Sequence, residues 1–263
     1  MGLVGHEGEI PMVRWCWLLW LLPGALWAEA IGGYAAGCQM NARALPGSGP
    51  GYYVIRSERQ RYYGQPQMIH YLQDLGHRVS RAGLPPMLVG DIAMQRGGPF
   101  AYGHRSHQTG LDADIWLRSP PANPLPRQLE TIEAVDMVDH RHYILSADFR
   151  DQQRQLLALA ARDQRVNRIF VHPLIKQAMC QAYGESPWLR KIRPWFGHSS
   201  HFHVRLTCPE GQSRCQPQAP VPAGTGCGAE LAGWLNDKAG EITAGPRTPW
   251  RPTLPKACVG WVR

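Results

Sequence analysis

The sequence predicts an α+β fold with a mostly antiparallel central sheet, helices packed on one side of it, and a C-terminal tail held by disulfides. Two segments alternate polar and apolar residues with the period of strands, and helix-spaced apolar residues occur between them. Gly and Pro account for 28 and 23 of the 263 residues, which indicates many loops and argues against a long helical bundle.

The first element, residues 1–30, is typical of a secretory signal peptide. Arg14 precedes a short apolar stretch that a Pro-Gly pair interrupts, and Ala28-Glu29-Ala30 forms a small-x-small cleavage pattern. This pattern allows cleavage after Ala30 or after Ala28. The apolar stretch is too short for a transmembrane helix, so no stable membrane span is expected in the mature chain.

The mature chain, residues 31–263, is expected to fold as a single domain with a C-terminal extension from about residue 207. Its first part, residues 31–50, is rich in Gly, Ala and Pro and is expected to be an irregular lead-in. Beyond it, hydrophobic periodicity predicts both helices and strands. The expected helices are 67–79, 148–162 and 173–183, the expected strands are 88–94, 112–117, 169–171 and 201–206, and a Pro-rich loop spans 119–126.

Two of these strands carry polar side chains on one face. In strand 112–117, Asp112, Asp114 and Trp116 point to one side and the apolar residues between them to the other. In strand 201–206, His201 and His203 project from the same face because residues two apart in a strand point the same way. The central sheet is therefore expected to carry metal ligands on one face and helices on the other.

Imidazole and carboxylate groups are concentrated in the two blocks 103–118 and 195–206, and both groups are good zinc ligands. Six residues separate His107 from Asp114, and a turn between them would bring both to one point. His107, Asp114 and one of the pair His201 and His203 give three ligands and leave a position for water, as in catalytic zinc sites. The pattern predicts hydrolysis by water activated at a metal.

Six cysteines remain beyond the signal peptide, and an even number in an exported chain indicates three disulfides formed in an oxidising compartment. Sequence alone leaves about 15 pairings open. None of these cysteines forms a CxxC pair, which disfavours a purely structural zinc site. Four of the six follow the second histidine block, in a Pro/Gly-rich tail where cross-links are expected to substitute for a core.

The charge balance limits the classes of partner. A formal net charge of +8 favours acidic partners, but the chain has no nucleic-acid-binding motif and no Lys/Arg run, so no nucleic-acid partner is expected. Neither Gly-x-Ser-x-Gly nor Ser-x-x-Lys occurs, which excludes the usual signatures of serine hydrolases and penicillin-sensitive enzymes.

The spacing HxxxxxxD followed by HxH resembles the superfamily of lysostaphin, D-alanyl-D-alanine metallopeptidases and sonic hedgehog. The longer strings GGPFAYGHRSHQTGLDADIWLR, RIFVHPLIK and WLRKIRPWFGHSSHFHVRL, with CGAEL downstream, resemble the penicillin-insensitive murein endopeptidases of Gram-negative bacteria over nearly all of the mature chain. The resemblance implies a periplasmic zinc endopeptidase that hydrolyses D-alanyl–meso-diaminopimelate cross-links of peptidoglycan and is insensitive to penicillin.

The resemblance also implies roles for single residues. It makes His107, Asp114 and His203 the ligands of one catalytic Zn²⁺, His201 a base or transition-state stabiliser, and His198 a further catalytic histidine. Either His201 or His198 is expected to pass the proton to the leaving amine. The glutamate or aspartate that serves as base in the dipeptidase branch has no counterpart here, since Ser199 and Ser200 precede the HxH motif. The general base therefore stays open.

A second metal position is implied at His104 with the Asp-x-x-His of Asp139 and His142. His140 replaces a usually small residue in that stretch, so a charged turn is the competing interpretation. The resemblance also implies three disulfides. They are Cys38–Cys258, Cys180–Cys227 and Cys208–Cys215.

Murein stem peptides carry free carboxylates, which a basic protein would attract. Arg105 and Arg205 are candidates for carboxylate contacts, and Trp116 for the wall of a substrate groove, with surface charge and core packing as the alternatives. Two other functions stay open. One is a D-Ala-D-Ala carboxypeptidase or dipeptidase on the same scaffold, and the other is a non-catalytic murein-binding module.

Overall fold

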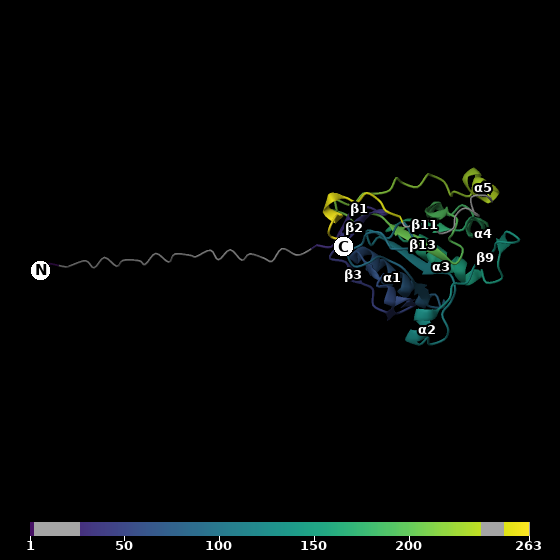
Figure 1. The fold of residues 1–263 in the computed structure, drawn as a ribbon, viewed down its shortest axis with the longest axis horizontal. Helices are drawn as coiled ribbons and strands as arrows, with labels where there is room; N and C mark the ends of the chain where they lie inside the picture. Colours follow the sequence, from purple (N-terminus) through teal and green to yellow (C-terminus); the bar gives the residue numbers. More distant parts are fainter. Residues whose placement is uncertain (3–26, 238–249, 263) are drawn as a thin grey trace.

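The computed structural model describes residues 1–2, 27–237 and 250–262, so most of the predicted signal peptide lies outside the described residues. Its centre is a seven-stranded sheet (Figure 1). The strands in order across the sheet are β12 (Ile192–Pro194), β11 (Val166–Val171), β13 (His201–Leu206), β8 (Asp112–Trp116), β7 (Met87–Val89), β5 (Tyr52–Val54) and β4 (Ser48–Gly49).

This sheet is mixed but mostly antiparallel, which confirms the predicted fold class. Four of its six neighbouring pairs are antiparallel, and the pairs β11–β12 and β5–β7 are parallel. The central pair is β13 and β8, whose register sets His203 opposite Asp114 and Arg205 opposite Asp112. The two blocks singled out in the sequence are therefore adjacent strands in the middle of the sheet.

Three helices cover the apolar face of the sheet: α1 (Pro66–Arg81), α3 (Asp151–Ala161) and α4 (Pro173–Tyr183). Helix α1 begins with a proline in its first turn, a position where the missing N–H has no helical partner. Its apolar residues Leu72, Leu75 and Val79 recur every three or four positions and are fully buried against the sheet. Each such side chain contributes about 1.5–3 kcal/mol by leaving water.

A short helix that the sequence did not predict, α2 (Pro126–Thr131), lies on the opposite face. Its Leu129 and the following Ile132 pack with Ile55 and Leu88. Leu88 stands opposite Trp116 in the ladder, so this small cluster covers the same face that carries the polar side chains of β8. Helix α2 thus supports one end of the ligand-bearing face.

The N-terminal segment forms two-stranded sheets, so the expectation of an irregular lead-in at 31–50 is wrong. Strand β1 (Glu29–Gly33) pairs with β2 (Ala36–Met40), and β3 (Arg43–Ala44) pairs with β6 (Tyr63–Gly64). The hairpin needs glycine at position 37, because a Cβ there would lie 2.4 Å from a backbone oxygen of β1 and 2.7 Å from the Thr109 side chain. A high glycine content is also typical of loops, so composition alone did not predict these strands.

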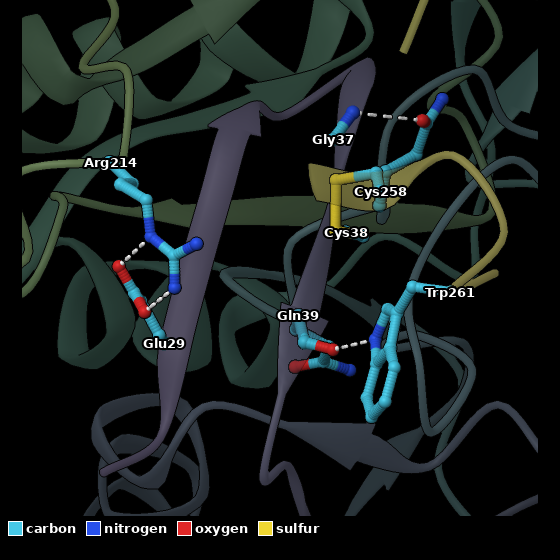
Figure 2. Close-up of a disulfide and its surroundings, with 8 residues drawn as sticks. Glu29, Gly37, Cys38, Gln39, Arg214, Cys258 and Trp261 are labelled. Atoms are coloured by element: carbon cyan, nitrogen blue, oxygen red, sulfur yellow. Dashed lines mark hydrogen bonds and ion pairs between the residues drawn. A yellow bond between two sulfur atoms is a disulfide. The ribbon is translucent and has the colours of Figure 1, made fainter. Parts of the chain in front are cut away.

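Strand β1 begins inside the predicted signal peptide. Ala30 is fully buried and its N–H donates to the Gln212 side chain at 2.8 Å. Glu29 forms a bidentate ion pair with Arg214, which Figure 2 shows beside the β1–β2 hairpin. Strand β1 therefore begins directly after Ala28, which is one of the two cleavage positions that the sequence allows, and the position of cleavage stays a prediction.

The three disulfides implied by the resemblance are confirmed. They are Cys38–Cys258, Cys180–Cys227 and Cys208–Cys215. The first joins β2 to the C-terminal segment, and the Trp261 indole donates to the Gln39 carbonyl beside it at 2.8 Å (Figure 2). The tail also contains a helix, which was not expected there. The remaining short elements are α5 (Ala229–Asn236), η1 (Ser57–Arg59), η2 (Pro187–Lys191), η3 (Lys256–Cys258), β9 (Val138–Asp139) and β10 (Ile144–Leu145).

Across the described parts of the chain, every helix is too short or too polar to cross a lipid bilayer.

Candidate metal centre

The centre is built on Asp114, in the middle of β8. Its Oδ1 lies 3.1 Å from Nδ1 of His203 on the neighbouring strand and 3.4 Å from Nε2 of His107. Its Oδ2 lies 3.1 Å from Nε2 of His104. Among the residues that the structure describes, His104, His107, Asp114 and His203 form a set whose ligand atoms all lie within 4.8 Å of one another.

These spacings fit a tetrahedral metal ion. Ligands at about 2.1 Å from a zinc ion in tetrahedral geometry are about 3.4 Å from one another. The Asp114–His107 and Asp114–His203 separations of 3.4 and 3.1 Å match that edge. Two imidazoles and a carboxylate are also the donor types that catalytic zinc sites use.

Unsatisfied polar atoms mark the same point. The buried atoms His107 Nε2, Asp114 Oδ1 and His201 Nε2 have no hydrogen-bond partner. Buried polar atoms without partners cost about 1–3 kcal/mol each. A cation shared by His107 Nε2 and Asp114 Oδ1 would satisfy two of these three atoms, and both residues belong to the four-residue cluster. The residues present therefore fit a divalent metal ion.

The orientation of each histidine is fixed by a second hydrogen bond. His107 Nδ1 lies 2.8 Å from the Ile92 carbonyl, which can only accept, so Nε2 is left with the free lone pair. His203 Nε2 lies 2.9 Å from Asp112 Oδ1, so Nδ1 is the atom that faces Asp114. Such outer contacts set the tautomer and raise the basicity of a metal ligand.

Asp112 organises the layer behind the ligands. This fully buried carboxylate accepts the backbone N–H of His107 at 3.0 Å and the Nε–H of Arg205 at 2.7 Å, besides its bond to His203. The bond to His107 also stabilises that residue in a left-handed conformation, with φ of 70°, which is costly for a side chain with a Cβ. One carboxylate therefore holds both histidines that flank Asp114.

The electrostatics follow from burial and mutual contact. Burial acts to raise the pKa of Asp114, but His104, His107 and His201 outweigh it and hold the pKa well below its usual range. Burial acts to lower the pKa of His107, but Asp114 outweighs it and raises the pKa to about 9 in the absence of a metal. Asp114 acts to raise the pKa of His104, but burial and the neighbouring histidines lower it to about 4.

The other histidines of the second block lie beside the cluster. His201 Nε2 is 3.8 Å from Asp114 Oδ1, and its ring centroid is 5.0 Å from that of His198. Burial lowers the pKa of both His198 and His201, so both imidazoles are neutral at neutral pH. Sequence reasoning thus located all five histidines that surround Asp114.

Asp139 is the last residue of β9, and His142 lies in the turn that follows it. The His142 ring contacts the Asp139 carboxylate at 2.7 Å, and both side chains are solvent-exposed. Asp139 also accepts the backbone N–H groups of Arg141 and His142, as a turn residue does. The four-residue cluster does not include this pair.

The three predicted substrate contacts have different positions. Arg105 is exposed and lies 5.0 Å from the centroid of the Trp250 ring. Arg205 is buried and is held by Asp112 and Gln218, so its guanidinium is directed behind the metal ligands. Trp116 lines a cavity next to the cluster, and its contact with substrate stays a prediction.

This cavity has a volume of about 180 Å³ and adjoins the cluster directly. Its lining includes His104, Asp114 and His201, and also Arg56 and Arg59, which the sequence did not single out. The parallel pairing of β5 with β7 brings residues 55–59 to this place, and neither arginine belongs to a local motif that would have revealed it.

Comparison with known proteins places this site in a family. A family model described as penicillin-insensitive murein endopeptidase matches residues 30–262. The chain belongs to this family. A member from Haemophilus influenzae is 52% identical over 233 residues, which are 86% of this chain and 81% of that protein. Members from Klebsiella pneumoniae and Escherichia coli are 42% and 39% identical over 262 residues, which are 98% of this chain and 94% of each relative.

Membership in the penicillin-insensitive murein endopeptidase family identifies the chain as a metallo-endopeptidase, and this confirms the enzyme class expected from the sequence. It agrees with the geometry, since four of the side chains that the family resemblance singled out converge on one point, namely His104, His107, Asp114 and His203.

Proposed function

We propose that this protein is a zinc-dependent murein endopeptidase that hydrolyses the D-alanyl–meso-diaminopimelate cross-links of peptidoglycan in the periplasm. The observation that carries the proposal is the convergence of His107 Nε2, His203 Nδ1 and Asp114 Oδ1, two of them unpartnered, in a chain of this family. The names of the curated relatives supply the murein substrate class.

We assign the cation to His107, Asp114 and His203. A divalent ion bound there would polarise a scissile carbonyl and acidify water. Zinc is the ion favoured by two imidazoles and one carboxylate, whereas calcium and magnesium prefer oxygen ligands alone. His104 contacts the other oxygen of Asp114, so it is available either as a fourth ligand or to a second ion.

His201 is the residue that we assign to move the proton. Its Nε2 is buried without a hydrogen-bond partner, and the residue lines the cavity. Burial lowers the pKa of His201, so the neutral imidazole can accept a proton. We propose that Nε2 takes a proton from the attacking water and passes it to the leaving nitrogen. His198, 5.0 Å away between ring centroids, supports His201 by staying uncharged beside it.

A second metal ion bound by His104, Asp139 and His142, which the family resemblance implies, is a separate proposal. In this structure the side chains of Asp139 and His142 contact each other in a surface turn, which supports a single metal ion. Elemental analysis of the purified mature protein decides the matter, because one zinc per chain agrees with the cluster and two would require the β9–β10 turn to contribute.

The test is digestion of purified cross-linked murein followed by chromatography of the muropeptides. We expect dimers to disappear with a matching gain of monomers, chelation to stop the reaction, and added Zn²⁺ to restore it. His107→Ala and His203→Ala should abolish cleavage. His77→Ala, an exposed histidine on helix α1, is the matched control and should cleave at the wild-type rate.

The same digestion separates the alternatives. Release of D-alanine from uncross-linked pentapeptides, with dimers left intact, would replace the endopeptidase by a carboxypeptidase. Retention of murein without any cleavage by the zinc-loaded wild-type protein would make the chain a binding module and would overturn the proposal.

A further inference from the structure

The cavity beside the metal centre has a positively charged wall that the reaction described above does not use. Arg56 and Arg59 line the same cavity as His104, Asp114 and His201, and Asp91 is also part of its lining. A cavity of about 180 Å³ admits part of an extended peptide and excludes a folded chain. Whatever binds at the metal centre therefore also meets these two guanidinium groups.

Nearby carboxylates neutralise this wall only in part. Asp91 forms its close ion pair with Arg61, at 2.7 Å, and approaches Arg59 no nearer than 4.0 Å. Burial, followed by the charge of Arg59, lowers the pKa of Arg56, while Asp91, Glu133 and Tyr102 oppose that shift. A negative group placed in the cavity would relieve this repulsion between the two arginines.

Arg56 is held in place before any ligand arrives. Its Nη2 donates to the Ile132 carbonyl at 3.0 Å, and its guanidinium lies 4.9 Å from the centroid of the Trp116 ring. Glu130 of helix α2 accepts the backbone N–H of Ser57 at 2.8 Å and so anchors the turn that carries both arginines. A positioned guanidinium binds a carboxylate with little further loss of side-chain entropy.

The chemistry of the proposed substrate supplies such a carboxylate. In a D-alanyl–meso-diaminopimelate cross-link, the leaving nitrogen is attached to a carbon that also carries a free carboxylate. With the scissile bond at the metal centre, that carboxylate is two bonds from the nitrogen and enters the adjoining space. A terminal D-alanine places its carboxylate in the same relation to the bond.

We propose that Arg56 and Arg59 form a carboxylate subsite that selects peptide bonds whose leaving nitrogen stands beside a free carboxylate. The inference rests on the proposed function, because it assumes that such bonds are cleaved at this centre. It adds residues that bind the substrate on the leaving-group side of the scissile bond, and these residues lie outside both histidine blocks.

The test compares two substrates with the zinc-loaded wild-type protein. One is a cross-linked muropeptide dimer, and the other is the same dimer with only the carboxylate beside the leaving nitrogen converted to an amide. We expect kcat/KM to fall about 30- to 100-fold on amidation, since hydrogen bonds to charged groups contribute at that level. Calorimetric titration of the chelated, metal-free protein should show the same preference in Kd.

Variants then assign the effect to the two arginines. In Arg56→Lys and Arg59→Gln, the ratio of kcat/KM between free and amidated dimers should shrink towards one, mainly through KM on the free dimer. Arg154→Gln is the matched control, because it removes an arginine from helix α3 on the other face of the sheet and should keep the wild-type ratio. Thermal unfolding identifies any variant that fails to fold.

The outcomes separate the two proposals. If the wild-type protein cleaves both dimers equally well, or if both arginine variants retain the full preference, the carboxylate subsite is refuted and the endopeptidase stands. If the wild-type protein cleaves neither dimer, the proposed function fails and the subsite fails with it. The amide comparison in the wild-type protein holds even where a variant does not fold.

Discussion

Replacing Asp112 by asparagine should damage both the fold and the metal centre, although no metal ligand is changed. Asp112 accepts from donors on both of its oxygens: His203 and Arg205 on Oδ1 and the His107 backbone on Oδ2. Burial acts to raise the pKa of Asp112, but Arg205 and His203 outweigh it and keep it ionised. An asparagine of the same shape has only one accepting oxygen. Its NH₂ group would therefore point at a donor, either the His107 backbone N–H or the side chains of His203 and Arg205.

The expected size follows from these contacts. Arg205 is only 8% exposed, and removal of one partner from a buried ion pair costs about 3–5 kcal/mol of unfolding free energy. Loss of the hydrogen bond that orients His203 should weaken metal affinity about 10- to 100-fold. Urea unfolding of the chelated protein gives the first quantity, and competition with a zinc indicator gives the second.

Two comparisons make the result interpretable. Asp151→Asn removes an aspartate that also pairs with an arginine but is 81% exposed, and it should cost no more than about 1 kcal/mol. The double variant Asp112→Asn with Arg205→Met removes both buried charges and should recover most of the stability, but not the metal affinity. Wild-type stability and wild-type metal affinity in Asp112→Asn alone would refute this account of the centre.

Three further predictions concern pH, cross-links and processing. In the metal-free protein, the pKa of His107 is raised from 6.5 to about 9. The protonated His107 therefore stabilises the folded state by about 3 kcal/mol, fully below pH 6.5, and this contribution is lost as pH rises through 9. Urea unfolding across this range should show the loss in the wild-type protein and not in His107→Gln. The entropy of closing each disulfide loop predicts that Cys38→Ser lowers the free energy of unfolding by about 5 kcal/mol and Cys208→Ser by about 2.5 kcal/mol. Equal losses of unfolding free energy, measured by denaturant unfolding, would contradict this prediction. Mass spectrometry of the exported protein should find Glu29 at the N-terminus, because cleavage after residue 30 would place a charged amine in a buried strand.

The sequence predicted the positions of Asp114 and His203 because both lie on regular strands, whereas His107 lies in a loop. The period of two in strands β8 and β13 sets Asp114 and His203 on one face, and that period is visible without any tertiary information. It could not show that Asp112 and Arg205 would bind each other behind the ligands, since a strand pattern gives the face of a residue and not its partner.

The parts that the sequence did not predict depend on contacts between distant segments. The β1–β2 hairpin is rich in Gly because its backbone packs closely against other segments, and composition alone made those residues resemble a loop. Arg56 and Arg59 reach the cavity through the parallel pairing of β5 and β7, which no local pattern records. Tertiary packing against β5 and β7 likewise decided where α2 formed.

The link between Cys38 and Cys258 spans 220 positions of the chain and closes nearly the whole domain into a covalent ring. A protease that cuts a single peptide bond anywhere within that ring opens it but releases no fragment. The nicked molecule keeps its mass, apart from one added water, and migrates as one species until it is reduced. One accidental cleavage in a surface loop therefore leaves the chain covalently joined. Without this disulfide, the same cut would leave two unlinked pieces unless it fell between Cys180 and Cys227, which the second disulfide joins.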